Sequence, residues 1–266
     1  MVIQRGPPVT GPWVSRHLPA VHSPGPSPDG HGPRTTFPAR PRWSKMISEI
    51  FAVSAAWSRS LIEFGDGLAP WTKAVVELGT DLLLIAFAVL FLAAWWRARS
   101  LGSRTVGLAL FAPVATVIAY MVSRTIKSFF EQMRPCQAMT DLSAIATCDP
   151  LGDWSFPSNH AAIAGAAAAA VVITWHRMAL PAAALAVLEA FSRVLVGAHY
   201  PHDVTVGLIT GAVVATLVSL ALARPLTGLV DRLSEVGLLR PLLRTGTPGR
   251  PTADVPARQP ETDTRV

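Results

Sequence analysis

Long apolar stretches separated by short polar turns dominate the middle of the chain. A helix needs about 20 apolar residues, with a tolerated range of roughly 17–25, to cross a hydrocarbon core about 30 Å thick. Five stretches reach or approach that length: Leu82–Trp96, Val106–Val122, Ala161–Trp175, Met178–Val196 and Val204–Ala223. Buried helices of a large soluble core would show more solvated faces between them. The pattern therefore predicts an all-α, integral-membrane helical bundle with five spans.

A sixth stretch, Ile47–Phe64, has a different pattern. At 100° per residue its apolar side chains fall on one side and its polar and charged side chains fall on the other. This arrangement is typical of a helix that lies in the membrane interface. A sixth span with its polar stripe packed inward is the alternative, although charged side chains are costly in the middle of a bilayer. We expect an amphipathic N-terminal helix in front of the five spans.

The two ends of the chain have a polar, proline-rich composition. Residues 1–45 contain ten prolines and five glycines, which favours a disordered tail. A start of translation at Met46 is a further hypothesis, in which this tail is not native. Residues 244–266 are also rich in Pro, Arg and Asp, so we expect one membrane domain, residues 46–243, between two disordered tails.

Composition and charge support a membrane protein. Half of the 266 residues are hydrophobic and only 15% are charged, whereas soluble domains carry about a quarter charged residues. The net charge of +6 resides mostly in residues 1–45, which contain six basic residues and a single acidic residue, Asp29. Nucleic-acid binding needs a basic face on a folded module, which the apolar middle of the chain does not offer. We therefore expect no nucleic-acid partner.

Basic residues mark one side of the predicted membrane. They follow the first, third and fifth spans: Arg97, Arg99, Arg104, His176, Arg177 and Arg224. The positive-inside rule assigns these ends to the cytoplasm. The long loop from Arg134 to Asn159 has three aspartates and no Lys or Arg after Arg134, so we expect it outside the cytoplasm.

Both cysteines of the chain, Cys136 and Cys148, fall in this outer loop. An oxidising compartment favours a disulfide over the alternative of two free buried thiols. A disulfide that closes a loop of about 13 residues lowers the entropy of the unfolded chain, and this stabilises the folded protein by roughly 3 kcal/mol. We therefore expect a disulfide in this loop.

Six ionisable side chains gather at the outer ends of the predicted spans, where ionisable groups are functional candidates. They are Lys127, Arg134, His160, Arg193, His199 and Asp203. Arginine matches phosphate oxygens through its planar fork, and lysine supplies a point charge. Either Ser158 or Asn159 is suited to cap the third span, whose first N–H groups would then point at the same anion. The cluster predicts a phosphate site. A small transporter or channel is the alternative class, but its charges would follow a path across the bilayer.

The two histidines of the cluster are suited to proton transfer and nucleophilic attack near neutral pH, since the ordinary pKa of histidine is about 6.5. Asp203 follows His199 by four residues and comes within reach of it if the chain is helical there. A carboxylate that holds one imidazole nitrogen makes the other a better nucleophile. The spacing therefore predicts an activated histidine.

Three segments together resemble the signature of the type 2 phosphatidic acid phosphatase superfamily in order and spacing. They are Lys127-Ser-Phe-Phe-Glu-Gln-Met-Arg134-Pro135, Pro157-Ser158-Asn159-His160, and Ser192-Arg193 followed by His199-Tyr-Pro-His-Asp203. The resemblance covers about residues 47–235. It implies hydrolysis of a phosphate ester or diphosphate through a phosphohistidine, without a metal ion or other cofactor.

The resemblance also implies a role for each matching residue. The catalytic residues would be the nucleophile His199, its orienting partner Asp203 and the general acid His160. The phosphate would be bound by Lys127, Arg134 and Arg193, with help from Ser158 and the backbone at Asn159. Glycine is the commonest residue of the family at position 159. Asparagine tolerates the left-handed conformation better than most residues, so we expect the turn to survive.

Within the superfamily, three features are similar to bacterial undecaprenyl-diphosphate phosphatases of the bacitracin-resistance type. They are the amphipathic N-terminal helix, the Phe-Pro-Ser-Asn-His form of the second motif and the Phe-Ser-Arg start of the third. This similarity implies a multi-pass enzyme of the bacterial inner membrane that recycles the lipid carrier of cell-wall synthesis, with its active site on the extracytoplasmic side. A phosphatidylglycerophosphate or phosphatidate phosphatase is the second hypothesis, because the charges alone do not distinguish a diphosphate from a monophosphate.

Overall fold

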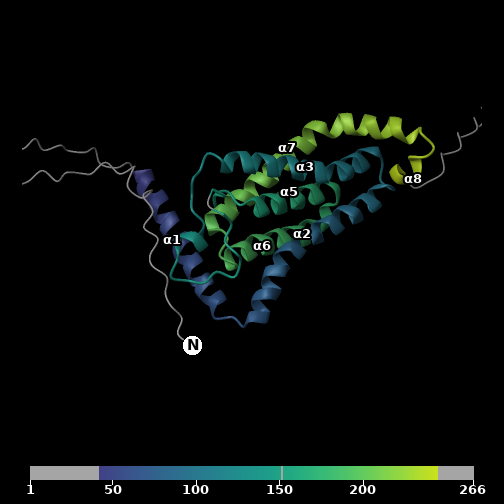
Figure 1. Cartoon of the computed structure of the whole chain (residues 1–266). Coiled ribbons are helices and arrows are strands. Elements are labelled where there is room, and N and C mark those ends of the chain that lie inside the picture. Colours follow the sequence, from purple (N-terminus) through teal and green to yellow (C-terminus); the bar gives the residue numbers. More distant parts are fainter. Residues whose placement is uncertain (1–41, 151, 245–266) are drawn as a thin grey trace, which may run out of the picture. The chain divides into compact units, whose positions relative to one another are not determined.

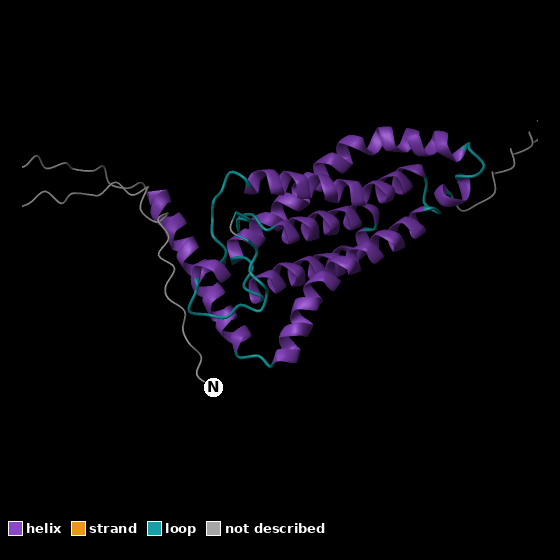
Figure 2. Ribbon diagram, viewed as in Figure 1, coloured by secondary structure: helices purple, strands orange, loops and turns teal. Residues whose placement is uncertain are grey.

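The computed structural model describes residues 42–150 and 152–244, and every regular element within them is a helix (Figures 1 and 2). The long helices are α1 (Arg42–Asp66), α2 (Pro70–Ala98), α3 (Ser103–Lys127), α5 (Asn159–Thr174), α6 (Ala179–Leu195) and α7 (Pro201–Ser234). The short ones are α4 (Pro135–Ala138), the 3-10 turn η1 (His176–Met178) and α8 (Arg240–Leu243). The predicted all-α fold is confirmed. Most of the two predicted tails lies outside the described residues.

Four of the predicted spans are helices long and apolar enough to cross a membrane, namely α2, α3, α6 together with η1, and α7. Their large apolar side chains are exposed along the outside of the bundle, for example Val89, Leu92, Val117, Val187, Ile209 and Leu217. Contiguous apolar surface of this extent is rare on soluble monomers. These faces are therefore suited to contact lipid.

The remaining predicted span, α5, is the central helix of the bundle. It has 16 residues, which is below the roughly 17 that a span requires. It packs against α2, α3, α6 and α7, and none of its residues is exposed. Its run of alanines lets the four neighbours approach closely. The helix therefore lies inside the bundle with its N-terminus at the end where the predicted site residues gather.

Glycines set the close approach between α5 and α7. A Cβ atom added to Gly207 would lie 2.5 Å from the carbonyl oxygen of Ser158, and one added to Gly211 would overlap the carbonyl group of Ala162. Only a residue without a side chain fits at such distances. These contacts fix the start of α5 against the first turns of α7, and both helices begin at the predicted site.

Helix α1 has the predicted amphipathic character and is not among the four helices that qualify as spans. Its small residues Ser54 and Ser58 are buried, whereas Trp57 and other large apolar residues are exposed. Figure 1 shows α1 across the end of the bundle, beside the long loop that follows α3. Arg59 pairs with Asp141 of that loop. The exposed apolar face supports the predicted location in the membrane interface.

Candidate active site

The structure brings the predicted cations and histidines together at one end of the bundle. A single cavity is lined by Lys127, Arg134, Asn159, His160, Arg193 and His199. These residues come from the end of α3, the loop before α4, the start of α5, the last turn of α6 and the turn before α7. Segments up to 72 residues apart in the chain, from Lys127 to His199, thus contribute to one site.

Ser158 and Asp203 are fully or almost fully buried beside this cavity and are not among the residues that line it. The hydroxyl of Ser158 accepts a hydrogen bond from the N–H of Ala161 at 3.4 Å, which makes Ser158 the N-cap of α5. Its own N–H donates to the carbonyl of Asp203 at 3.1 Å. Of the two predicted caps, the structure therefore selects Ser158.

The left-handed conformation expected at Asn159 is wrong. Among the described residues no non-glycine residue has a positive φ, and Asn159 is the first residue of α5. Position 159 therefore requires no left-handed conformation. The Asn159 side chain instead accepts a hydrogen bond from the hydroxyl of Ser123 at 3.0 Å, which ties the start of α5 to α3.

A tight turn between α6 and α7 places His199. The carbonyl of Arg193 accepts hydrogen bonds from the N–H groups of both Ala198 and His199, at 3.1 and 3.2 Å. Gly197 has a φ of 80°, and a Cβ there would lie 2.8 Å from the Cβ of Ala144. Glycine is thus required by both backbone conformation and space. The turn fixes the backbone of His199 to that of Arg193.

The environment of His199 fixes its charge and its tautomer. Burial lowers the pKa of His199 to about 4, although the nearby carboxylate of Asp203 acts to raise it. The imidazole is therefore neutral near pH 7. The guanidinium Nη1 of Arg134 lies 3.3 Å from Nε2 of His199, and a guanidinium can only donate. The proton is consequently assigned to Nδ1, and the lone pair of Nε2 faces the cation.

The other ring nitrogen, Nδ1, faces a carboxylate and a hydroxyl. Nδ1 of His199 is 3.7 Å from Oδ2 of Asp203 and 3.4 Å from the hydroxyl of Ser155. That hydroxyl donates to Oδ2 of Asp203 at 2.5 Å. The predicted pair of His199 and Asp203 is thus brought together, and the hydroxyl of Ser155 contacts both groups. Sequence reasoning missed Ser155, since a serine in a polar loop carries no distinctive pattern.

Two carboxylates of the outer loop pair with the cations of the cavity. Arg134 Nη2 lies 2.9 Å from Asp149 and 3.0 Å from Asp153, and the Lys127 ammonium lies 3.1 Å from Asp153. Burial acts to raise the pKa of Asp153, but Lys127 and Arg134 outweigh it and hold that pKa below its ordinary value. The carboxylate is therefore ionised. Sequence reasoning gave these aspartates no role at the site.

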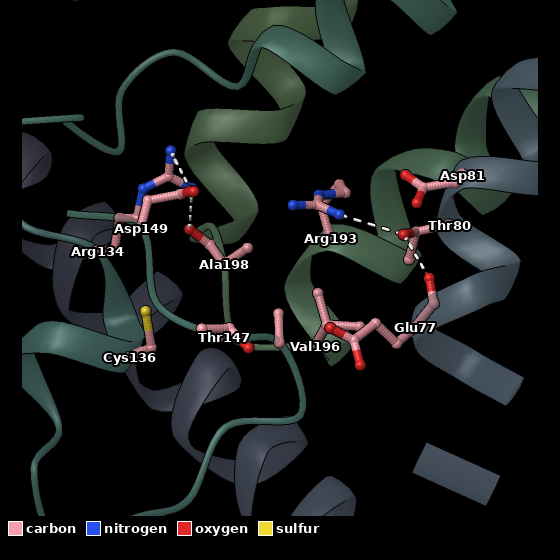
Figure 3. Close-up of a pocket in the computed structure, with 11 residues that line it drawn as sticks. Glu77, Thr80, Asp81, Arg134, Cys136, Thr147, Asp149, Arg193, Val196 and Ala198 are labelled. Carbon is pink, nitrogen blue, oxygen red and sulfur yellow. Dashed lines mark hydrogen bonds and ion pairs between the residues drawn. The ribbon is translucent and has the colours of Figure 1, made fainter. Parts of the chain in front are cut away.

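The side chain of Arg193 is held by a residue of α2, a contact that the sequence did not predict. Its Nη1 donates to the hydroxyl of Thr80 at 3.3 Å, as Figure 3 shows. A second polar cavity lies here, lined by Thr80 and Asp81 and sharing Arg134 and Arg193 with the first. Arg193 therefore separates two cavities, and Thr80 fixes its direction.

Cys136 and Cys148 form a disulfide with Cα atoms 6.0 Å apart. The cross-linked loop is fastened to the turn that carries His199. The N–H of Cys136 donates to the carbonyl of Gly197 at 3.2 Å, and the N–H of Ala146 donates to that of Val196 at 3.0 Å. The disulfide thus stabilises the wall of the site. In the part of the chain that the structure describes, no group of three or more His, Cys, Asp or Glu side chains is arranged to hold a metal ion.

The chain is similar to known proteins over its central and C-terminal helices. Residues 108–225 match the PAP2 superfamily. Undecaprenyl-diphosphatase BcrC of Bacillus subtilis (strain 168) is 28% identical over 158 residues, which cover 59% of this chain and 79% of BcrC. A lipid A 1-phosphatase of Rhizobium johnstonii is 40% identical over 93 residues, which cover 34% of this chain and 37% of that protein.

A solved structure also resembles the chain. It is a transmembrane PAP2 type phosphatidylglycerolphosphate phosphatase from Bacillus subtilis, with a TM-score of 0.48 and 19% sequence identity. The match covers 70% of this chain and 88% of that chain. The superfamily match places similarity to the PAP2 superfamily in residues 108–225, and the relatives named here are phosphatases. The predicted resemblance is confirmed.

Proposed function

We propose that the chain hydrolyses a lipid phosphate through a phosphohistidine formed on Nε2 of His199. The observation that carries this proposal is the neutral imidazole whose Nε2 faces Arg134, in a cavity that also contains Lys127, His160 and Arg193. Cations in such a site stabilise the charge on the transferring phosphoryl group.

The chemistry proceeds in two steps. The lone pair of His199 Nε2 attacks the terminal phosphorus, the bond from this phosphorus to the oxygen that it shares with the leaving lipid or lipid phosphate breaks, and His160 gives that oxygen a proton. Water then attacks the phosphorus of the phosphohistidine while His160 takes back a proton, and the P–N bond breaks to release inorganic phosphate. The phosphate oxygens are bound by Lys127, Arg134 and Arg193. The cap residue Ser158 and the backbone at Asn159, at the start of α5, help to bind them. Asp203 orients His199.

The substrate we propose is undecaprenyl diphosphate, which yields undecaprenyl phosphate and inorganic phosphate. The similarity to BcrC over most of that protein supports this choice, as does the amphipathic α1 in front of the bundle. A phosphatidylglycerophosphate or phosphatidate phosphatase is the second candidate, and a lipid monophosphate would use the same cations. We place the enzyme in the inner membrane with its site outside the cytoplasm, because the disulfide suits an oxidising compartment.

Purified protein in detergent tests this proposal. Phosphate release is measured from undecaprenyl diphosphate and from phosphatidate, each with and without a chelator. We expect faster release from the diphosphate and no loss of rate in the chelator. The substitution His199→Ala removes the nucleophile and should lower kcat by at least about 1000-fold, whereas His176→Ala, in η1, should leave it unchanged. A chelator-sensitive rate or an active His199→Ala variant contradicts the mechanism, and faster turnover of phosphatidate contradicts the substrate.

A further inference from the structure

The contact between the histidine and the aspartate of the site is indirect. Nδ1 of His199 and Oδ2 of Asp203 are 3.7 Å apart, which is beyond a normal hydrogen bond. The hydroxyl of Ser155 lies beside both groups, 3.4 Å from Nδ1 and 2.5 Å from Oδ2. A hydroxyl can accept one hydrogen bond and donate another at the same time. Ser155 can therefore connect the two groups where they do not connect directly.

The directions of these hydrogen bonds follow from the partners. Asp203 is ionised when it orients a neutral histidine, and a carboxylate only accepts, so the hydroxyl proton of Ser155 points to Asp203. The remaining lone pairs of the Ser155 oxygen face Nδ1, which carries the proton of the His199 ring. The hydrogen bonds thus run in one direction, from Nδ1–H to Ser155 and from Ser155 to Asp203.

The surroundings hold Ser155 in this position. Its side chain has no exposed surface, and its N–H donates to the carbonyl of Gln132 at 2.7 Å. Oδ2 of Asp203 is held in turn by the N–H of Tyr200 at 2.9 Å. Ser155 and its acceptor Asp203 are therefore both held by hydrogen bonds from backbone N–H groups. A buried hydroxyl with this geometry has little freedom to turn elsewhere.

We propose that Ser155 is a positioning residue for the nucleophile, because its hydroxyl links His199 to Asp203 and so fixes the orientation of the imidazole and the proton on Nδ1. The inference rests on the proposed function, in which Nε2 of His199 attacks phosphorus. Ser155 has no contact with the cavity itself. Its loss should therefore affect the chemical step more than substrate binding.

The test compares Ser155→Ala with the matched control Ser58→Ala. Ser58 is equally buried, but its hydroxyl has no hydrogen-bond partner and it lies on α1. We expect Ser155→Ala to lower kcat by about 10- to 100-fold, the range for a lost hydrogen bond to a charged group, with KM changed by less than about 3-fold. Ser155→Thr, which keeps the hydroxyl, should recover most of kcat. Ser58→Ala should leave both constants unchanged.

A double-mutant comparison separates positioning from a general loss of structure. If Ser155 acts through Asp203, Ser155→Ala should cost little further activity in a protein that already carries Asp203→Asn. Where Ser155→Ala fails to fold, Ser155→Cys, similar in size but a weak donor, is used in its place. An unchanged kcat, or fully additive losses, overturns the inference. An active His199→Ala variant overturns the proposed function instead, so the two failures are distinguishable.

Discussion

At the residue scale, the cations that we propose to bind phosphate are paired with aspartates of the outer loop. Asp153 contacts both Lys127 and Arg134, and nearly half of its side chain is exposed. A phosphate that enters the cavity competes with this carboxylate for the same cations. We therefore expect the aspartate to weaken the binding of phosphate, including the inorganic phosphate that the proposed reaction releases.

The substitution Asp153→Asn tests this competition. It removes one negative charge while keeping the size of the side chain, so inorganic phosphate should inhibit at a concentration about 2- to 5-fold lower, as expected for a partly exposed ion pair. The inhibition constant of phosphate is measured at constant ionic strength. Asp66→Asn, which removes a comparable pairing with Lys73, should leave that constant unchanged. An inhibition constant that stays the same or rises in Asp153→Asn contradicts the competition.

Sequence reasoning found the charged residues of the site because charge is conspicuous among apolar spans. Lys127, His160 and Arg193 each interrupt or end a stretch of apolar residues, and the structure brings them into one cavity. Ser155 and Thr80 were missed because hydroxyl side chains are common in loops and near helix ends. Their importance depends on distances between segments that are distant in the sequence, which the pattern along the chain does not contain.

At the scale of helices, the contact between α5 and α7 determines whether the three motifs meet. Gly211 of α7 lies so close to α5 that a methyl group would overlap the carbonyl group of Ala162. Because this contact is between two backbones, the overlap is not relieved by a change of rotamer. The start of α5, with His160, would have to move away from the turn that carries His199.

We therefore expect Gly211→Ala to lower both thermal stability in detergent and activity. Overpacking of this kind costs about 1–3 kcal/mol. Gly228→Ala is the control on the same helix, since nothing lies within 4 Å of its added Cβ and alanine favours a helix by about 1 kcal/mol over glycine. The midpoint of thermal unfolding and kcat are measured for both variants. If the two variants unfold at the same temperature, α5 and α7 do not depend on this close contact.

The helices were predicted better than their ends. The predicted span Leu82–Trp96 lies inside α2, which begins at Pro70, because Glu77 and Asp81 lower the hydropathy of turns that are nonetheless helical. The last span continues in α7 to Ser234, past Pro225. Hydropathy reports the part of a helix that is suited to lipid, whereas backbone hydrogen bonds continue the helix into the polar interface.

At the scale of the whole molecule, the positions of charge and of the disulfide define a side of the membrane. The turn between α2 and α3 is flanked by Arg97, Arg99 and Arg104, and the site lies at the opposite ends of these two helices. From the positive-inside rule we expect the turn in the cytoplasm and the site outside. The location is independent of the catalytic mechanism, so it requires its own measurement.

Single introduced cysteines measure this orientation directly. Ser100, in the turn after α2, and Glu131, in the loop after α3, are both exposed. In intact cells, a maleimide that does not cross the membrane should label Glu131→Cys and should label Ser100→Cys only after the cells are permeabilised. The parent protein should stay unlabelled without a reductant, because its two cysteines are joined. The reverse pattern would place the site in the cytoplasm, where a reducing environment is at odds with the disulfide.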